Sequence, residues 1–228
     1  MSKVASIQIG MPISIEIGKP WRTGFFKKAV TEPVWLGATN LAGDGQADLA
    51  HHGGPHKAVC VYPACHYPYW RQTLGMPDLC GGDFGENFTV EDLAESQVCI
   101  GDTWAIGDAT VQVSQPRQPC WKLARRWDAK DLAVQVQQTG RTGWYFRVLV
   151  EGLVQAGMSL SLIERPHPRW TIATANQLMH HEKSNYAAAA ELAAVPHLSP
   201  SWQQTLVKRV QHKVEQDDQA RLEGQDQS

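Results

Sequence analysis

The density of turn residues is the feature that most constrains the fold of this 228-residue chain. Up to about residue 166, Gly, Pro and Asp recur every few positions, and the stretches between them are short and rich in β-branched and aromatic residues. Long helices are excluded there because Gly and Pro end or kink them. Many short strands at this density are typical of a β-barrel or folded sheet. We expect strands over residues 5–9, 13–17, 34–36, 57–62, 104–106, 110–114, 146–150 and 160–164.

Few helices interrupt these strands. One is predicted over residues 131–138, with Asp128 as a candidate N-cap and Gly140 as its stop. Another would follow Tyr62, although Pro68 is expected to break or shift it.

The chain changes character near residue 167, where the turn residues disappear. Thr171, Ser184 and Ser199 can each cap a short amphipathic helix. The sequence therefore predicts a mainly β protein with α: a barrel domain over 1–166, a three-helix domain over 167–216, and a disordered polar tail over 217–228.

One cysteine has an unusual setting. Cys120 follows two prolines, which stiffen its loop, and precedes residues that favour a helix. At a helix N-terminus, with Arg117, Lys122 and Arg125 nearby, its pKa would be lowered. A thiolate attacks electrophiles and binds soft metals, so Cys120 is the first candidate functional residue. The alternative is a small buried hydrophobe, the usual state of a free cysteine, and the cationic surroundings disfavour it.

The other four cysteines lack such neighbours. Cys60 and Cys99 fall in apolar runs and are expected in the core, while Cys65 and Cys80 show no special context. An odd total of five without Cys-x-x-Cys spacing argues against a disulfide framework and against a structural zinc or iron–sulfur site.

Charge and hydropathy exclude several classes of function. A formal net charge of −2 gives no reason to expect a nucleic-acid or membrane-surface binder. No apolar run approaches the ~20 residues of a membrane helix, and the first ten residues lack a signal-peptide pattern. A cytoplasmic protein is expected.

Other polar clusters lie upstream of Cys120. Residues 43–48 include Asp44 and Gln46, and a Gly-Gly-Pro turn separates His52 from Lys57. Such a turn lets backbone amides approach a ligand, and both flanking side chains can contact an anion. A metal site is the alternative, because a helix would bring His52, His56 and Cys60 to one face. The Gly-Gly-Pro turn would interrupt such a helix and disfavours this alternative. A plain surface turn remains a second alternative.

A further group, residues 84–89, is less specific. Glu86 and Asn87 either line a pocket or cap a plain turn before a strand.

Four segments together resemble the MOSC family, the domain named for the C-terminal part of molybdenum-cofactor sulfurase. They are His52–Pro55, Phe84–Asn87, Gln115–Leu123 and Thr139–Tyr145, and the resemblance runs from about residue 10 to 165. The helical tail resembles the three-helix appendage of a bacterial subgroup that protects cells against N-hydroxylated base analogues. Two residues depart from the pattern on the substrate side: His56, where relatives usually carry an acidic residue, and Pro68.

The resemblance implies a β-barrel that holds a molybdenum–pterin cofactor, with Cys120 as the molybdenum ligand and catalytic residue. It also implies a set of cofactor-binding residues: Asp44, Gln46, His52, Lys57, Glu86, Asn87, Arg117 and Lys122. The implied activity is reduction of small N-hydroxylated compounds, such as hydroxylaminopurines, to the parent amines. Electrons would come from a separate partner protein, because no flavin, nicotinamide or iron–sulfur motif is present.

Two other classes remain open. The protein could carry the molybdenum cofactor, or deliver sulfur through Cys120, without reductase activity. The same relation to a sulfurase also suggests an association with pyridoxal phosphate, but the sequence shows no evident pyridoxal-phosphate domain. Alternatively, the tail is an interaction module through Lys208, Arg209 and Lys213, although the acidic residues that follow favour a solvated helix face. The oligomeric state, monomer or homodimer, is left open.

Overall fold

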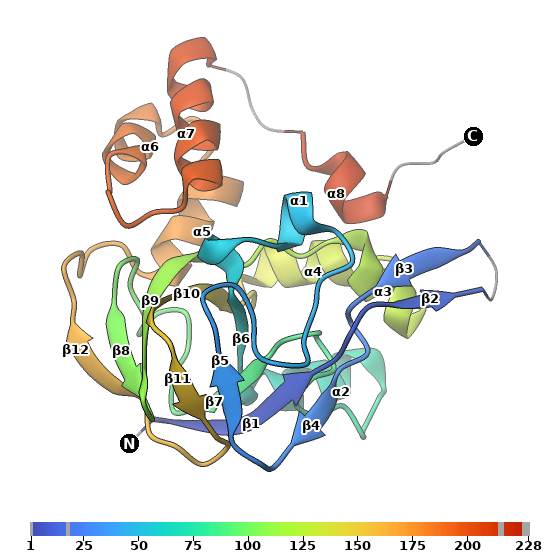
Figure 1. Cartoon of the computed structure of the whole chain (residues 1–228). Helices are drawn as coiled ribbons and strands as arrows, with labels where there is room; N and C mark the ends of the chain where they lie inside the picture. Colours follow the sequence, from blue (N-terminus) through green and yellow to red (C-terminus); the bar gives the residue numbers. More distant parts are fainter. Residues whose placement is uncertain (1, 17–18, 214–216, 225–228) are drawn as a thin grey trace.

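An eight-stranded sheet that curls into a half-barrel forms the body of the computed structural model, which describes residues 2–16, 19–213 and 217–224 (Figure 1). In spatial order its strands are β12 (Ser161–Glu164), β8 (Thr103–Ile106), β9 (Ala109–Pro116), β10 (Trp144–Val150), β6 (Val59–Pro63), β7 (Phe88–Glu91), β1 (Lys3–Ile9) and β4 (Lys28–Val30). Adjacent strands are antiparallel except β6 and β7, which are parallel. The mainly β barrel fold predicted from the turn density is confirmed.

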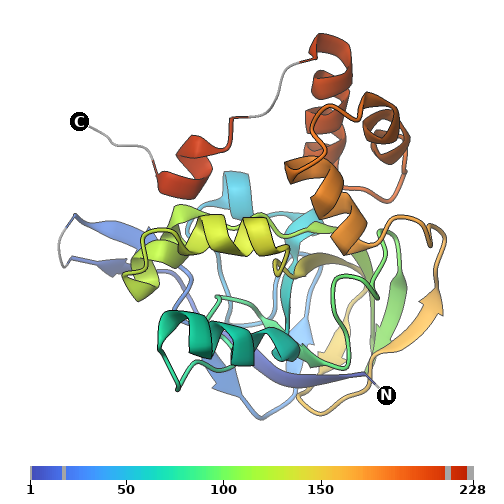
Figure 2. The ribbon, with the colours of Figure 1, turned by 180° about the vertical axis from the view of Figure 1, so that it is seen from behind.

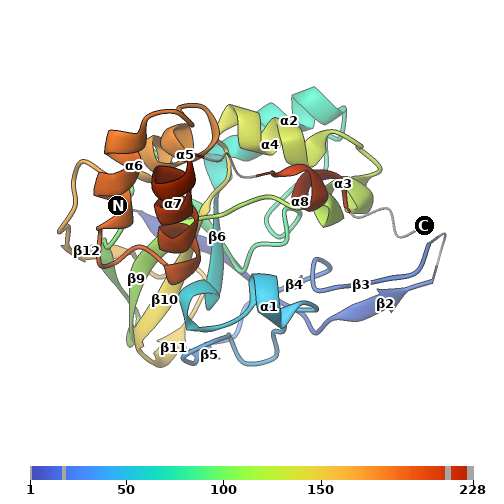
Figure 3. The same cartoon turned by 90° about the horizontal axis from the view of Figure 1, so that it is seen from above.

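Two small sheets complete the β structure. β5 (Val34–Leu36) pairs with β11 (Gly152–Val154), and β2 (Ile13–Ile15) pairs with β3 (Trp21–Thr23). The β2–β3 hairpin reaches away from the barrel beside α3 (Trp121–Trp127) (Figure 3).

Helices flank the barrel on the side seen in Figure 2. They are α2 (Tyr67–Leu74), α3 and α4 (Leu132–Thr139), while α1 (Leu49–His52) lies apart from α3 and α4 (Figure 3). Pro68 does not break α2, because it occupies the first turn, where its missing N–H is not needed. Asp128 does not begin α4: it ends α3 in the left-handed region, at φ 49°, and Asp131 precedes α4.

The C-terminal helices are α5 (Ile172–His180), α6 (Tyr186–Ala193) and α7 (Pro200–His212). Thr171 and Ser199 cap α5 and α7 as predicted, by accepting from the backbone N–H of Thr174 and Trp202. The predicted cap of α6 was wrong by one residue, since Asn185 rather than Ser184 accepts from the Ala188 N–H.

Barrel and helices share one hydrophobic core. Leu178, Trp202 and Leu206 belong to the same cluster of buried side chains as Val113 and Phe146. The proposed division of the chain near residue 166 therefore stays a prediction. Arg209 is buried within this region and donates to the carbonyls of Leu178 and Met179, so it is not available to an external partner.

The polar tail was predicted to be disordered, but within it the segment Asp217–Gly224 contains the short helix α8 (Gln219–Glu223). α8 lies over α3 and α4 (Figures 1 and 3). Residues 225–228 lie outside the described residues. Over the described ranges, no helix combines the length and apolar character that a membrane crossing requires.

Candidate functional site

A narrow cavity of about 70 Å³ lies next to a wide groove of about 1190 Å³. The residues that line both are Asp48, His52, Lys57, Gln118, Cys120, Lys122 and Tyr145. They come from α1, the turn after it, the loop after β9, α3 and β10. The fold thus brings together the cysteine motif and the His–Gly–Gly–Pro turn, which are more than 60 residues apart in sequence.

Cys120 is the N-cap residue of α3, as the sequence predicts. Its side chain is buried, with 6% of the residue exposed. Burial raises the pKa of the thiol, although the backbone N–H of Lys122 and the charges of Arg117 and Lys122 act in the opposite direction. The predicted low pKa is therefore wrong for the protein alone. A metal ion would reverse this, since a coordinating thiol is deprotonated outright.

Arg117 lies buried in the cavity wall with 4% of the residue exposed. Its Nη2 donates to the Phe84 carbonyl at 2.6 Å, while Nη1 has no hydrogen-bond partner. Burial opposes its charge, but Cys60, Tyr145 and Cys120 hold its pKa above the ordinary value. A buried guanidinium with an unused donor is rare, because the lost hydrogen bond is costly. This donor marks the place where an anion or other acceptor fits.

His52 and Lys57 lie on either side of the Gly-Gly-Pro turn. Burial, with repulsion from Lys57 and Lys122, lowers the pKa of His52 to about 4, so its ring is neutral at pH 7. Burial also lowers the pKa of Lys57, whose ammonium donates to the His51 carbonyl. At pH 7 the His52 ring therefore carries no charge, and the positive charge beside it comes from Lys57 and Lys122.

Gln46 and Asn87 line the cavity, whereas Asp44 and Glu86 do not. Glu86 is fully buried and accepts from the Gly82 N–H at 2.8 Å, the Thr89 hydroxyl at 2.9 Å and the Tyr67 hydroxyl. It holds the loop that presents the Phe84 carbonyl to Arg117.

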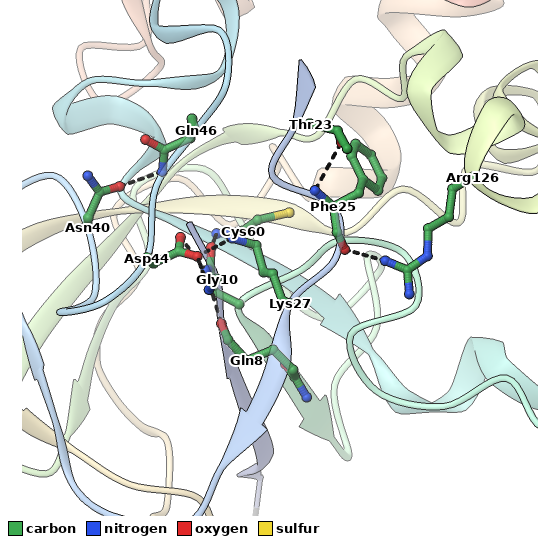
Figure 4. A network of polar contacts seen from close by, with 11 residues as sticks. Gln8, Gly10, Thr23, Phe25, Lys27, Asn40, Asp44, Gln46, Cys60 and Arg126 are labelled. Carbon is green, nitrogen blue, oxygen red and sulfur yellow. Dashed lines mark hydrogen bonds and ion pairs between the residues drawn. The ribbon is translucent and has the colours of Figure 1, made fainter. Parts of the chain in front are cut away.

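Asp44 belongs to a set of residues that we call the floor network: Lys27, Asp44, Cys60 and Asn87. Figure 4 shows Lys27, Asp44 and Cys60 close together, and Lys27, Cys60 and Asn87 line the cavity. Asp44 pairs with the buried Lys27 ammonium and accepts from the Gly10 N–H at 2.9 Å and from Asn87 Nδ2 at 2.8 Å. Asn87 Oδ1 in turn accepts from the Cys60 N–H at 3.0 Å. These hydrogen bonds and the ion pair are made within the protein, and they fix the shape of this part of the cavity.

The cavity lining also contains polar residues that the sequence did not single out as site residues: Lys27, Asp48, Cys60, Gln118 and Tyr145. Cys60 is buried as predicted, but it also lines the cavity and is hydrogen-bonded to the Tyr145 side chain. Burial raises the pKa of both groups, so both remain protonated. Cys60 and Tyr145 are direct partners in the β6–β10 register. Nothing in the local sequence around Cys60 signals that pairing.

The ligand set of His52, His56 and Cys60 is not assembled. Among the residues that the structure describes, no group of three or more His, Cys, Asp or Glu side chains is placed to hold a metal ion. All five cysteines are free. A metal at Cys120 would need most of its ligands from a cofactor.

Comparison with known proteins assigns the chain to a family. Residues 48–161 match the MOSC domain, and residues 170–213 match the YiiM-like 3-alpha helix domain. The chain belongs to the MOSC family. It is 46% identical to the uncharacterized protein YflK of Bacillus subtilis, over 90% of this chain and 93% of YflK. It is 38% identical to protein YiiM of Escherichia coli, over 84% and 85% of the two chains.

Solved structures agree with this assignment. Crystal structures of YiiM from Geobacillus stearothermophilus and from Escherichia coli superpose with TM-scores of 0.79 and 0.80, at 40% and 30% identity. They cover 92% and 97% of this chain, which spans 100% and 98% of the two structures. A protein of Gibberella moniliformis named "Reductase" is 34% identical over 79% of this chain, which matches only 32% of that protein.

Proposed function

We propose that this protein is a molybdenum-cofactor-dependent reductase that converts small N-hydroxylated compounds, such as hydroxylaminopurines, to the parent amines. Membership of the MOSC family and a relative named as a reductase support an oxidoreductase. The observation that carries the proposal is that Cys120 and Arg117, whose buried Nη1 has no hydrogen-bond partner, line the same cavity.

The residues present fit such a cofactor. Cys120 offers one soft ligand to a metal otherwise held by pterin sulfurs. Arg117, Lys57 and Lys122 line the same cavity and suit the anionic phosphate of a pterin, where charge-assisted hydrogen bonds are strongest. The groove exceeds the ~300–1,000 Å³ of a typical small-molecule site, which leaves room for cofactor and substrate together.

When bound, the cofactor supplies the two-electron chemistry that removes oxygen from the substrate nitrogen. The protein supplies orientation and electrostatics. Arg117 and Lys122 stabilise negative charge beside Cys120, while the neutral His52 offers a directional hydrogen bond. Tyr145 keeps its hydroxyl proton, because burial raises its pKa, and its side chain is hydrogen-bonded to Cys60 in the cavity wall. Electrons come from a separate redox partner.

The decisive experiment measures molybdenum and pterin in protein purified from a host that makes the cofactor, then assays hydroxylaminopurine reduction with a reduced dye as electron donor. We expect about one molybdenum per chain and turnover to the amine. Cys120→Ser should abolish turnover while the fold survives, because a hydroxyl stays protonated and binds soft metals poorly.

The exposed Cys65 provides the matched control, since Cys65→Ser should remain active. Wild-type protein without molybdenum and pterin would contradict the cofactor assignment. A loaded but inactive protein would instead favour a cofactor or sulfur carrier.

A further inference from the structure

The C-terminal segment Asp217–Gly224 forms one wall of the groove beside Cys120. Six of its residues line the groove: Asp217, Ala220, Arg221, Leu222, Glu223 and Gly224. α1 and the β2–β3 hairpin line other parts of the same groove, and Figure 3 shows α8 set apart from both, above α3. The position of this segment therefore sets the width of the groove where it meets Cys120.

Arg221 attaches the segment to the cysteine loop. Its Nη1 donates to the carbonyl of Pro119, the residue before Cys120. Its Nη2 donates to Gln137 Oε1 on α4 at 2.6 Å and lies 2.9 Å from the Asp218 carboxylate. One guanidinium thus joins three parts of the chain.

Asp218 and Gly224 secure the two ends. Asp218 accepts from Gln137 Nε2 at 3.4 Å and lies 3.6 Å from Nδ1 of His180 on α5. At the other end, Gly224 packs against the Trp121 ring, where an added Cβ would lie 3.4 Å from Cγ. Trp21 of the hairpin also contacts Trp121, with ring centroids 5.8 Å apart. The segment is consequently fastened to α3, α4 and α5 rather than lying free in solvent.

We propose that Asp217–Gly224 is a specificity-determining wall that limits the size of the compounds that reach Cys120, and that Arg221 is the residue that positions it. The substrate class that fits is a small free heterocycle rather than a base within a polymer. This inference rests on the proposed function in taking Cys120 as the centre of reaction.

The test measures access to Cys120 in the cofactor-free protein, with N-ethylmaleimide and a fluorescein-bearing maleimide as small and bulky probes. Peptide mapping by mass spectrometry assigns the labelling to Cys120. Because the reactive group is the same, the ratio of the bulky to the small rate reports the width of the groove and cancels the reactivity of the thiol. The variants are Arg221→Gln and a truncation after Lys213.

We expect Arg221→Gln to raise the ratio by about tenfold, the scale for losing a charge-assisted hydrogen bond, and the truncation to raise it further. Arg169→Gln is the matched control, because Arg169 pairs with Glu191 on the exposed face of the C-terminal helices. Labelling of the buried Cys99 should stay unchanged, which verifies the fold.

An unchanged ratio in the truncated protein would overturn the proposal. Since this readout needs no cofactor and no turnover, it separates failure of the wall from failure of the reductase assignment. In loaded, active protein, the truncation should lower KM for bulky N-hydroxylated compounds more than for small ones. The opposite order would also overturn it.

Discussion

The floor network and the groove are built on opposite principles. In the floor network, Asp44 and Asn87 make several hydrogen bonds of 2.8–3.0 Å within the chain, and the Lys27 ammonium pairs with a buried carboxylate. The groove instead presents aromatic and cationic side chains, such as Trp121 and Arg125, beside a large open volume. The internal bonds of the floor network fix the shape of the cavity, whereas the open volume of the groove leaves room for ligands.

Removing Asp44 should have the largest effect on stability. Asp44→Ala leaves the buried Lys27 ammonium without its carboxylate, which we expect to cost ~3–5 kcal/mol in the free energy of unfolding. Denaturant melts measure it. The exposed pair of Lys3 and Glu91 supplies the control, where Glu91→Ala should cost less than ~1 kcal/mol. Equal losses of unfolding free energy in the two variants would mean that the buried pair in the floor network stabilises the fold no more than the exposed pair does.

A second test concerns a buried ion pair outside the floor network. Glu95 accepts from the Gly143 N–H at 2.8 Å and pairs with the ring of His66 at 2.7 Å. Burial opposes protonation of His66, but Cys65 and Glu95 outweigh it and raise its pKa to about 9.

Because the pKa of His66 is higher in the folded than in the unfolded protein, the pair contributes fully to the free energy of unfolding below pH 6.5. This contribution is lost as the pH rises through 9. We expect a decline of roughly 2–3 kcal/mol over that window. His66→Gln should flatten the decline in urea melts collected at several pH values. A profile that is as steep in the variant as in the wild type would contradict the pairing.

On the ligand side, the cations of the cavity should matter for retention of the cofactor. Ala at Lys57, Arg117 or Lys122 should weaken pterin retention on the scale of ~1.5–3 kcal/mol for a charge-assisted bond. Arg169→Ala is the control, because that guanidinium pairs with the exposed Glu191 and lies outside the lining of both the cavity and the groove. Unchanged pterin content in all three cavity variants would place the anion site elsewhere.

Cys60→Ser should give the smallest measurable effect. The serine keeps the shape of the side chain but alters the contact with Tyr145, so we expect a loss of about 1 kcal/mol and somewhat lower cofactor content. Cys80→Ser, at an exposed position, should leave both quantities unchanged. If the two variants behaved alike, Cys60 would be a packing residue only.

Features set by neighbouring residues could be predicted, and features set by distant ones could not. The helix that starts after Cys120 and the caps at Thr171 and Ser199 follow from a few adjacent positions. The thiol pKa was predicted in the wrong direction because the charges are local in sequence, whereas burial depends on the whole fold.

Tertiary partners explain the other differences. The effect of Pro68 depended on where α2 begins, which the proline itself does not determine. The order of the polar tail depends on Arg221 meeting Pro119 and Gln137, residues that lie more than 80 positions away in the chain. The contact of Cys60 with Tyr145 depends on strand register in the same way.

The core shared by barrel and helices has a consequence for how the protein is made. Ser199 at the start of α7 donates its backbone N–H to the carbonyl of Ser114 on β9, the strand that leads into the Cys120 loop. During synthesis, the ribosome releases α7 only after every strand has emerged. Until then the core cluster that includes Val113 and Phe146 lacks Trp202 and Leu206. Folding around the cysteine loop is therefore completed only after α7 has emerged, so the cysteine site depends on a helix that follows all the described strands in the sequence.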